Sequence, residues 1–239
     1  MSTDLNIDLE DSRRFEETIS ELALYKRKTE EEIIDKIKNS MTERNIEWEE
    51  YSKNSIIDFH RLTEYNLYCL AKWNSEKKYQ DTINYISYII KKNSGNVLDF
   101  GGGIGTLTIL LKNQGNSTDF MEVPSETLNY ATWRFKRRFL DLNIYTTLNQ
   151  IKITYNNIVA LDVLEVLEKP LAHLKKFYDL LDSNGLLIFS IGDTNSKSHP
   201  MNLSRNTEFF NNIDEYCKEI GFIDSKYHNK FNLKIKKKP

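Results

Sequence analysis

Residues 97–105 read Val97-Leu98-Asp99-Phe100-Gly101-Gly102-Gly103-Ile104-Gly105. Four of the nine glycines in the chain fall within the last five of these positions. Glycine adopts positive φ at little cost and lets the backbone approach a ligand closely. In open α/β folds, a strand, a glycine-rich turn and a helix, in that order, hold a ligand at the helix N-terminus. The stretch therefore predicts an α/β fold with a ligand site at this turn.

The spacing of the glycines argues against a dinucleotide. Dinucleotide sites carry the pattern G-x-G-x-x-G, whose third glycine allows helix and strand to pack closely beside a pyrophosphate. Thr106 occupies that third position here, and Gly105 comes one residue too early. A second marker is Glu122, at the end of the next predicted strand, where a carboxylate can accept hydrogen bonds from two ribose hydroxyls. The expected cofactor is therefore a nucleoside without a pyrophosphate.

Strands and helices alternate after residue 94, which predicts a mainly parallel sheet with helices on its faces. Strands are expected at 96–100, 118–122, 143–146, 157–161 and 186–190, and helices at 106–113, 125–140, 170–181 and 207–220. A terminal hairpin is expected from 222–227 and 231–235.

Residues 1–93 contain no glycine and no proline, and their pattern is helical and rich in charge. Thr29 and Glu32 form a capping-box signature, and the apolar spacing predicts one helix over 56–73 and another from about 75 that ends by Gly95. We therefore divide the chain into an N-terminal helical region, 1–93, and a cofactor-binding domain, 94–239. The helices are expected to form a lid over the acceptor pocket or a homodimer contact.

Several segments, taken in order, resemble the class I S-adenosylmethionine-dependent methyltransferases. Residues 97–105 resemble the first motif of that family, and Glu122 matches its ribose-binding acid. Residues 158–165 resemble its fourth-strand segment, and 174–190 its next helix, turn and strand. The resemblance covers about residues 96–237. It implies a Rossmann-like fold with a mainly parallel seven-stranded sheet, an antiparallel terminal hairpin and, here, an N-terminal helical extension.

The resemblance implies that the cofactor is S-adenosylmethionine. The residues expected to bind it are Asp99, Phe100, Gly101, Gly102, Gly103, Gly105, Glu122, Val123, Leu161 and Asp162. Three features depart from the family pattern. Val166 replaces a frequent histidine, Asn157 replaces a frequent aspartate, and 146–155 offers no acid for the adenine amino group. The two cysteines, Cys69 and Cys217, are isolated and indicate no metal site.

Methyl transfer from a sulfonium is an in-line displacement, so the protein mainly positions the partners and excludes water. An acceptor hydroxyl or ammonium must also lose a proton, and His199 is the candidate general base. It lies in the polar loop 192–205 after the fifth strand, and substrates bind beyond such strand ends. An ordinary loop histidine is the alternative, and Asp162 is a second ionisable candidate. Tyr65, Tyr68, Trp73, Tyr79 and Tyr85 are interpreted as helical core, with a pocket lining as the alternative.

The predicted function is methyl transfer to the oxygen or nitrogen of a small molecule. One alternative is a non-catalytic methyltransferase-like domain that acts in protein interaction, and another is an RNA or protein methyltransferase. Nucleic acid is not expected, because the net charge is −2 and the basic stretches 134–138 and 234–238 are interpreted as solvated surface. No membrane association is expected either, and the acidic N-terminal ten residues resemble no secretory signal, so a cytoplasmic location is expected.

Overall fold

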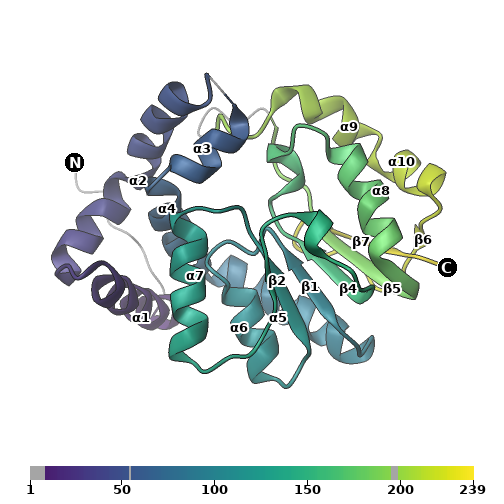
Figure 1. The fold of residues 1–239 in the computed structure, drawn as a ribbon, viewed down its shortest axis with the longest axis horizontal. Helices are drawn as coiled ribbons and strands as arrows, with labels where there is room; N and C mark the ends of the chain where they lie inside the picture. The colour runs from purple at the N-terminus through teal and green to yellow at the C-terminus, as the bar shows by residue number, and fades with distance from the viewer. Residues whose placement is uncertain (1–8, 54, 195–198) are drawn as a thin grey trace.

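The computed structural model describes residues 9–53, 55–194 and 199–239, and a single seven-stranded sheet forms its centre (Figure 1). The strands are β1 (Val97–Phe100), β2 (Thr118–Met121), β3 (Ile144–Tyr145), β4 (Tyr155–Ala160), β5 (Leu181–Ser190), β6 (Ile223–Asp224) and β7 (Leu233–Lys237). Their order is β3-β2-β1-β4-β5-β7-β6, and only β7 runs antiparallel to its neighbours. The predicted Rossmann-like methyltransferase topology is therefore confirmed.

The order of the strands reverses beside β1, which pairs in parallel with β2 on one edge and β4 on the other. Phe100 lies opposite Met121 of β2, and Asp99 lies opposite Val159 of β4, so the carboxyl ends of the three strands lie at about the same level. All residues of β1 are buried, which agrees with its central place and its apolar sequence. In open α/β sheets, ligands bind at the carboxyl ends of the strands beside such a reversal.

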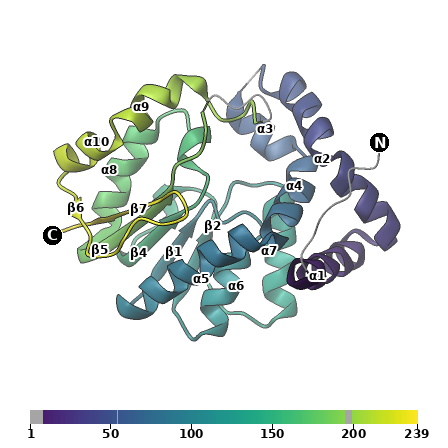
Figure 2. The same cartoon turned by 180° about the vertical axis from the view of Figure 1, so that it is seen from behind.

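Helices cover both faces of the sheet. Figures 1 and 2 show α5 (Lys77–Lys92) and α6 (Thr106–Asn113) on one face, with α8 (Pro170–Leu180) and α10 (Ile213–Ile220) on the other. Ile83, Ile86 and Ile90 of α5 pack against Val97 and Val159, so α5 belongs to the layers around the sheet. The division of the chain at residue 93 stays a prediction.

The expected helix over 207–220 is two helices, α9 (Thr207–Asn211) and α10, which meet at Asn212. The expected helix over 56–73 is likewise two, α3 (Ile56–Leu62) and α4 (Tyr65–Ser75). Glu47 explains this second break, because its carboxylate accepts hydrogen bonds from the Thr63 hydroxyl and from the backbone N–H groups of Glu64 and Tyr65. A side chain from another helix thus caps the start of α4.

The remaining N-terminal helices are α1 (Leu9–Lys26) and α2 (Glu30–Tyr51), and the capping box of Thr29 and Glu32 is confirmed at the start of α2. α1, α2 and α4 share an apolar cluster that also takes in Ile104 and Tyr130 of the sheet domain. We call α1 to α4 the helical cap.

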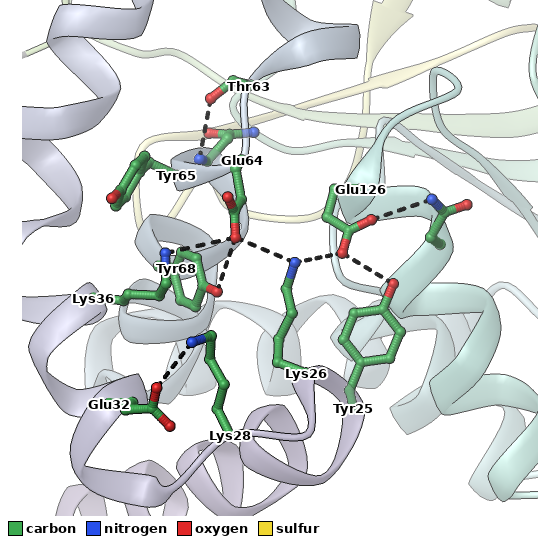
Figure 3. Close-up of polar contacts among 12 residues, drawn as sticks. Tyr25, Lys26, Lys28, Glu32, Lys36, Thr63, Glu64, Tyr65, Tyr68 and Glu126 are labelled. Carbon is green, nitrogen blue, oxygen red and sulfur yellow. Dashed lines mark hydrogen bonds and ion pairs between the residues drawn. The ribbon is translucent and has the colours of Figure 1, made fainter.

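A polar network joins the helical cap to α7 (Glu126–Arg137), the helix that follows β2 (Figure 3). Lys26 Nζ lies 2.5 Å from Glu126 Oε1 and 3.4 Å from Glu64 Oε1. Tyr25 donates a hydrogen bond to Glu126, and Tyr68 donates one to Glu64. Lys26 thus links α1 to the start of α4 and to α7. Its side chain is only 15% exposed, so these ion pairs are partly desolvated.

Candidate functional site

A cavity of about 1010 Å³ lies between the carboxyl ends of the strands and the helical cap. On the sheet side it is lined by residues that follow β1, β2, β4 and β5, and on the other side by α2, α3, α4 and α5. Its volume is at the upper end of the range for small-molecule sites. The cavity therefore lies where the strand order predicts a ligand.

The glycine turn forms one wall of this cavity. Gly101, Gly103 and Gly105 have φ values of +65°, +57° and +77°, a region that favours glycine. A Cβ on Gly101 would lie 2.4 Å from Cγ2 of Val163, and one on Gly105 would lie 2.5 Å from the Phe135 ring. The turn thus needs glycine both for its backbone conformation and for close packing.

Glu122 is held against this turn at the end of β2. Its Oε2 accepts a hydrogen bond of 2.9 Å from the backbone N–H of Gly103, and its Oε1 accepts one of 2.8 Å from that of Val123. Burial raises the pKa of Glu122 to about 7, with a smaller contribution from Asp99, although the two backbone bonds act to lower it. Each carboxylate oxygen can accept a further hydrogen bond, which suits a pair of ribose hydroxyls.

Asp99 lies beneath the turn rather than in the cavity wall. It is 3% exposed and accepts a hydrogen bond of 2.6 Å from the Thr108 hydroxyl in α6. A Cβ on Gly102 would lie 2.7 Å from the Asp99 carboxyl, so the turn packs directly on this side chain. Burial raises the pKa of Asp99 to about 6. Asp99, Gly102 and Gly105 do not line the cavity, and their position indicates that they support the turn.

Asp162 follows β4 with a φ of +51°, which is uncommon for a residue other than glycine and often marks a functional site. Its backbone N–H donates a 2.6 Å hydrogen bond to Ser190 Oγ, which in turn donates a 2.8 Å bond to Asp162 Oδ1. Burial raises the pKa of Asp162, opposed by Ser190 and Lys78. The structure thus brings together in one cavity Phe100, Gly101, Gly103, Glu122, Val123, Leu161 and Asp162.

Glu165 also lines the cavity, and sequence reasoning gave it no role. It lies in a short 3-10 turn after β4 and is 2% exposed, and its Oε2 has no hydrogen-bond partner among the described residues. Burial, reinforced by the charge of Asp162, raises its pKa to about 8. Gly192 leaves room for the carboxyl, because a Cβ there would lie 2.0 Å from Glu165 Oε1. The available signal was an acid inside the apolar run 163–167.

His199 lines the cavity and is half-buried, and its role as a general base stays a prediction. Burial lowers its pKa, Arg44 lowers it further, and Asp193 opposes them. Residues 195–198 of the predicted loop lie outside the described residues. Trp73 and Tyr79 also line the cavity, so for these two the pocket alternative applies, whereas Tyr68 is fully buried in the core of the cap.

Adenine recognition is still unassigned, since no residue of 146–155, all of which the structure describes, lines the cavity. Over the described ranges there is also no group of three or more His, Cys, Asp or Glu side chains that could hold a metal ion. No helix within these ranges is long and apolar enough to cross a bilayer.

Residues 71–224 match the model of the protein family described as "Methyltransferase domain". Because this match covers more than half of the chain, the protein belongs to that family, and its resemblance to the S-adenosylmethionine-dependent methyltransferases is confirmed. No curated protein is a significant sequence match.

Several solved structures share the fold. An O-methyltransferase family protein from Burkholderia thailandensis has a TM-score of 0.58 at 13% identity, covering 83% of this chain and 71% of its own. Magnesium protoporphyrin IX methyltransferase from Synechocystis PCC 6803, with bound S-adenosylmethionine, has a TM-score of 0.53 at 17% identity, covering 70% and 83%. The N-methyltransferase NodS from Bradyrhizobium japonicum WM9, with bound S-adenosyl-L-homocysteine, has a TM-score of 0.51 at 14% identity, covering 68% and 88%. At these identities the similarity shows the fold alone.

Proposed function

We propose that this enzyme transfers the methyl group of S-adenosylmethionine to an oxygen or nitrogen of a small-molecule acceptor. The cofactor is the methyl donor of the family to which the chain belongs. The observation that carries the proposal is the hydrogen bond from the backbone N–H of Gly103 to the Glu122 carboxylate, because it holds the glycine turn and this acid together at the cavity wall. The neighbours named above include enzymes that methylate oxygen and nitrogen, which supports these two acceptor atoms.

The residues present fit the cofactor. Gly101 and Gly103 leave the cavity wall free of side chains, and Glu122 offers acceptor capacity to a ribose. The carboxyls of Glu122, Asp162 and Glu165 all have raised pKa values, because desolvation by the surrounding protein disfavours their charged forms. A ligand with positive groups stabilises those charges, whereas a pyrophosphate would repel them. The site therefore favours a cationic nucleoside over a dinucleotide.

When bound, S-adenosylmethionine supplies a methyl group on a positively charged sulfur. The protein itself orients the two reactants and excludes water from the site. Glu122 and the glycine turn fix the nucleoside half, and Ser190 holds the carboxyl of Asp162 at the end of β4. Helices α2 to α4 cover the acceptor side of the cavity. This arrangement serves an in-line displacement, which depends mainly on the alignment of the two reacting atoms.

His199 is the proposed acceptor of the proton that an acceptor hydroxyl or ammonium must lose. Its lowered pKa keeps the imidazole neutral near physiological pH, and a neutral ring can act as a base. His199→Ala should reduce turnover by about 100-fold or more without weakening cofactor binding. Normal turnover in this variant would leave His199 as an ordinary loop residue.

The test of the proposed function is formation of S-adenosylhomocysteine from S-adenosylmethionine across a panel of small hydroxyl and amine acceptors. Product formation that needs both an acceptor and an intact Gly101 supports the proposal. Failure of the folded protein to bind either nucleoside in a calorimetric titration would instead favour a non-catalytic domain.

A small-molecule acceptor is proposed in preference to nucleic acid because the basic stretches are partly neutralised. Arg134 is 9% exposed and pairs with Glu21, and Lys236 is 7% exposed and pairs with Asp214 and Asp224. These two residues were expected on the solvated surface, and their burial corrects that expectation. Salt-dependent binding of RNA would contradict the proposal. A cytoplasmic location and a homodimer through the helical cap stay predictions.

A further inference from the structure

An arginine of α7 holds the glycine turn from the side opposite the cavity. Arg134 Nη1 donates a hydrogen bond of 2.7 Å to the backbone carbonyl of Ile104, which lies between Gly103 and Gly105. The same nitrogen donates one of 3.1 Å to the Thr106 hydroxyl at the start of α6. Arg134, Ile104 and Thr106 do not line the cavity, so the arginine contacts the turn away from the proposed cofactor.

The middle of the turn depends on such contacts. Gly103 and Gly105, on either side of Ile104, both have positive φ, and glycine has more backbone freedom to lose than any other residue. Side chains fix this part of the turn from two directions. Glu122 accepts a hydrogen bond from the N–H of Gly103 on the cavity side, and Arg134 donates one to the Ile104 carbonyl on the opposite side. A turn that is already held in its binding conformation binds a ligand more tightly, because less freedom is lost on binding.

Arg134 is in turn oriented by α1, which lies beside α7 in both views of the fold (Figures 1 and 2). Its Nε donates a 3.0 Å hydrogen bond to Glu21 Oε2, and Oε1 of the same carboxylate lies 2.6 Å from Arg138 Nη1. The Arg134 and Glu21 side chains are 11% and 16% exposed, so solvent screens the pair little. Because a guanidinium is planar, the bond from Nε to Glu21 also sets the direction in which Nη1 points.

The face of α7 that carries this arginine also packs against the turn. A Cβ on Gly105 would lie 2.5 Å from the Phe135 ring and 3.6 Å from Cβ of Ala131. Ile104 shares an apolar cluster with Leu22 of α1. The turn therefore meets α1 and α7 through apolar contacts as well as through the arginine.

We propose that Arg134 is a positioning residue for cofactor binding, which holds the glycine turn in its binding conformation and is itself oriented by Glu21. The inference rests on the proposed binding of S-adenosylmethionine at this turn. Glu21 belongs to α1, whereas the match to the methyltransferase family covers residues 71–224. Cofactor affinity thus depends on a helix outside the segment that matches the family.

The test is calorimetric titration of S-adenosylhomocysteine into the wild type and Arg134→Met, at a temperature where circular dichroism shows both to be folded. Methionine keeps the apolar part of the side chain but donates no hydrogen bond to Ile104 or Glu21. We expect the dissociation constant to rise at least about tenfold, because the turn then occupies its binding conformation for only part of the time. Wild-type affinity in Arg134→Met would overturn the proposal.

Lys26→Met is the matched control. Lys26 also pairs α1 with α7, through Glu126 at 2.5 Å, but its two partners, Glu64 and Glu126, lie outside the glycine turn. Affinity for S-adenosylhomocysteine should therefore change less than about twofold, in keeping with an ion pair that only joins the two helices. An equal loss in Lys26→Met and Arg134→Met would assign the effect to loosening of α1 and overturn the role of the arginine.

Two conservative variants separate the links and decide the matter if Arg134→Met does not fold. Arg134→Lys keeps the charge but cannot reach the carbonyl and Glu21 with paired donors, so its dissociation constant should rise about threefold. Glu21→Gln keeps the size of the side chain without its charge and should have an effect of about the same size. Wild-type affinity in Glu21→Gln would overturn the dependence on α1, and wild-type affinity in both variants would overturn the proposal.

The wild type distinguishes this inference from the proposed function. If the folded wild type binds no S-adenosylhomocysteine, the proposed function fails and the inference fails with it. If the wild type binds and Arg134→Met, Arg134→Lys and Glu21→Gln all bind equally well, only the role of Arg134 is contradicted.

Discussion

The two sides of the cavity are built in different ways. The cofactor side is formed by short turns at strand ends, such as the turn that carries Gly101 and Gly103 after β1 and Glu122 to Val123 after β2. The cap side consists of single side chains from separate helices, among them Arg44, His60 and Trp73. A site built from backbone turns leaves a contiguous pattern in the sequence, whereas a site built from tertiary packing leaves scattered residues. The residues of the turns are constrained by the backbone conformation that they adopt. The residues of the cap side are constrained instead by the groups of the acceptor that they contact.

The largest effect is expected at the glycine turn. Gly101→Val forces a side chain into a position with positive φ and into contact with Val163, so the turn must move away from the cavity wall. We expect cofactor affinity to fall by at least about 100-fold, which corresponds to roughly 3 kcal/mol. Titration calorimetry with S-adenosylhomocysteine measures this, and near-native affinity would contradict the role of the turn.

Gly115→Ala is the matched control. Gly115 also has positive φ, +82°, but an added Cβ would meet nothing within 4 Å. This variant should lose about 1 kcal/mol of stability from backbone strain and keep its cofactor affinity. If both glycine variants lose affinity equally, general destabilisation explains the result.

Replacement of Glu165 measures how much its buried carboxyl lowers the unfolding free energy of the ligand-free protein. Its pKa in the folded state, about 8, lies above the ordinary value of about 4.3, so folding disfavours the ionised form. The unfolding free energy should therefore fall as pH rises from about 4 and level off above about 8. Glu165→Gln should show a smaller fall than the wild type, because only Asp99, Glu122 and Asp162 then contribute to it. At pH 9 the variant should exceed the wild type by up to roughly 5 kcal/mol, since each pH unit between the folded and the ordinary pKa is worth about 1.4 kcal/mol. Urea unfolding at pH 5 and pH 9 measures it, and parallel changes in both proteins would contradict the assignment.

Glu122 should make cofactor binding depend on pH. Its pKa of about 7 means that at pH 6 only about one carboxyl in ten is ionised and able to accept both ribose hydroxyls. The dissociation constant for S-adenosylhomocysteine should therefore be up to about tenfold higher at pH 6 than at pH 8. Glu122→Gln should bind more weakly and lose this slope. An unchanged slope in the variant would place the titrating group elsewhere.

The smallest effect is expected where the two sides are joined. Lys26→Met removes the cation between Glu64 and Glu126 and should lower stability by about 1 kcal/mol, because those carboxylates lose a partly desolvated partner. Cofactor affinity should change less than twofold. Lys28→Met, which breaks only an exposed pair with Glu32, is the control and should change stability by less than about 0.5 kcal/mol. A large loss of cofactor affinity in Lys26→Met would show that the network also shapes the glycine turn.

The same contrast explains what could be predicted from the sequence. The sheet, the turn at Gly101 and the acid at Glu122 were predictable because each follows from local pattern and spacing. The break between α3 and α4 was not, since Glu47 caps α4 from another helix. Arg44 and His60 were missed for the same reason, because only folding brings α2 and α3 to one cavity. Glu165 was overlooked although an acid in an apolar run was visible.

The most direct measurement is calorimetric titration of S-adenosylhomocysteine into the wild type, Gly101→Val and Arg44→Gln, with folding checked by circular dichroism. If the two sides of the cavity act separately, the wild type and Arg44→Gln should bind S-adenosylhomocysteine with equal affinity. Gly101→Val should show no measurable binding. Equal losses in both variants, or undiminished binding by Gly101→Val, would contradict the account.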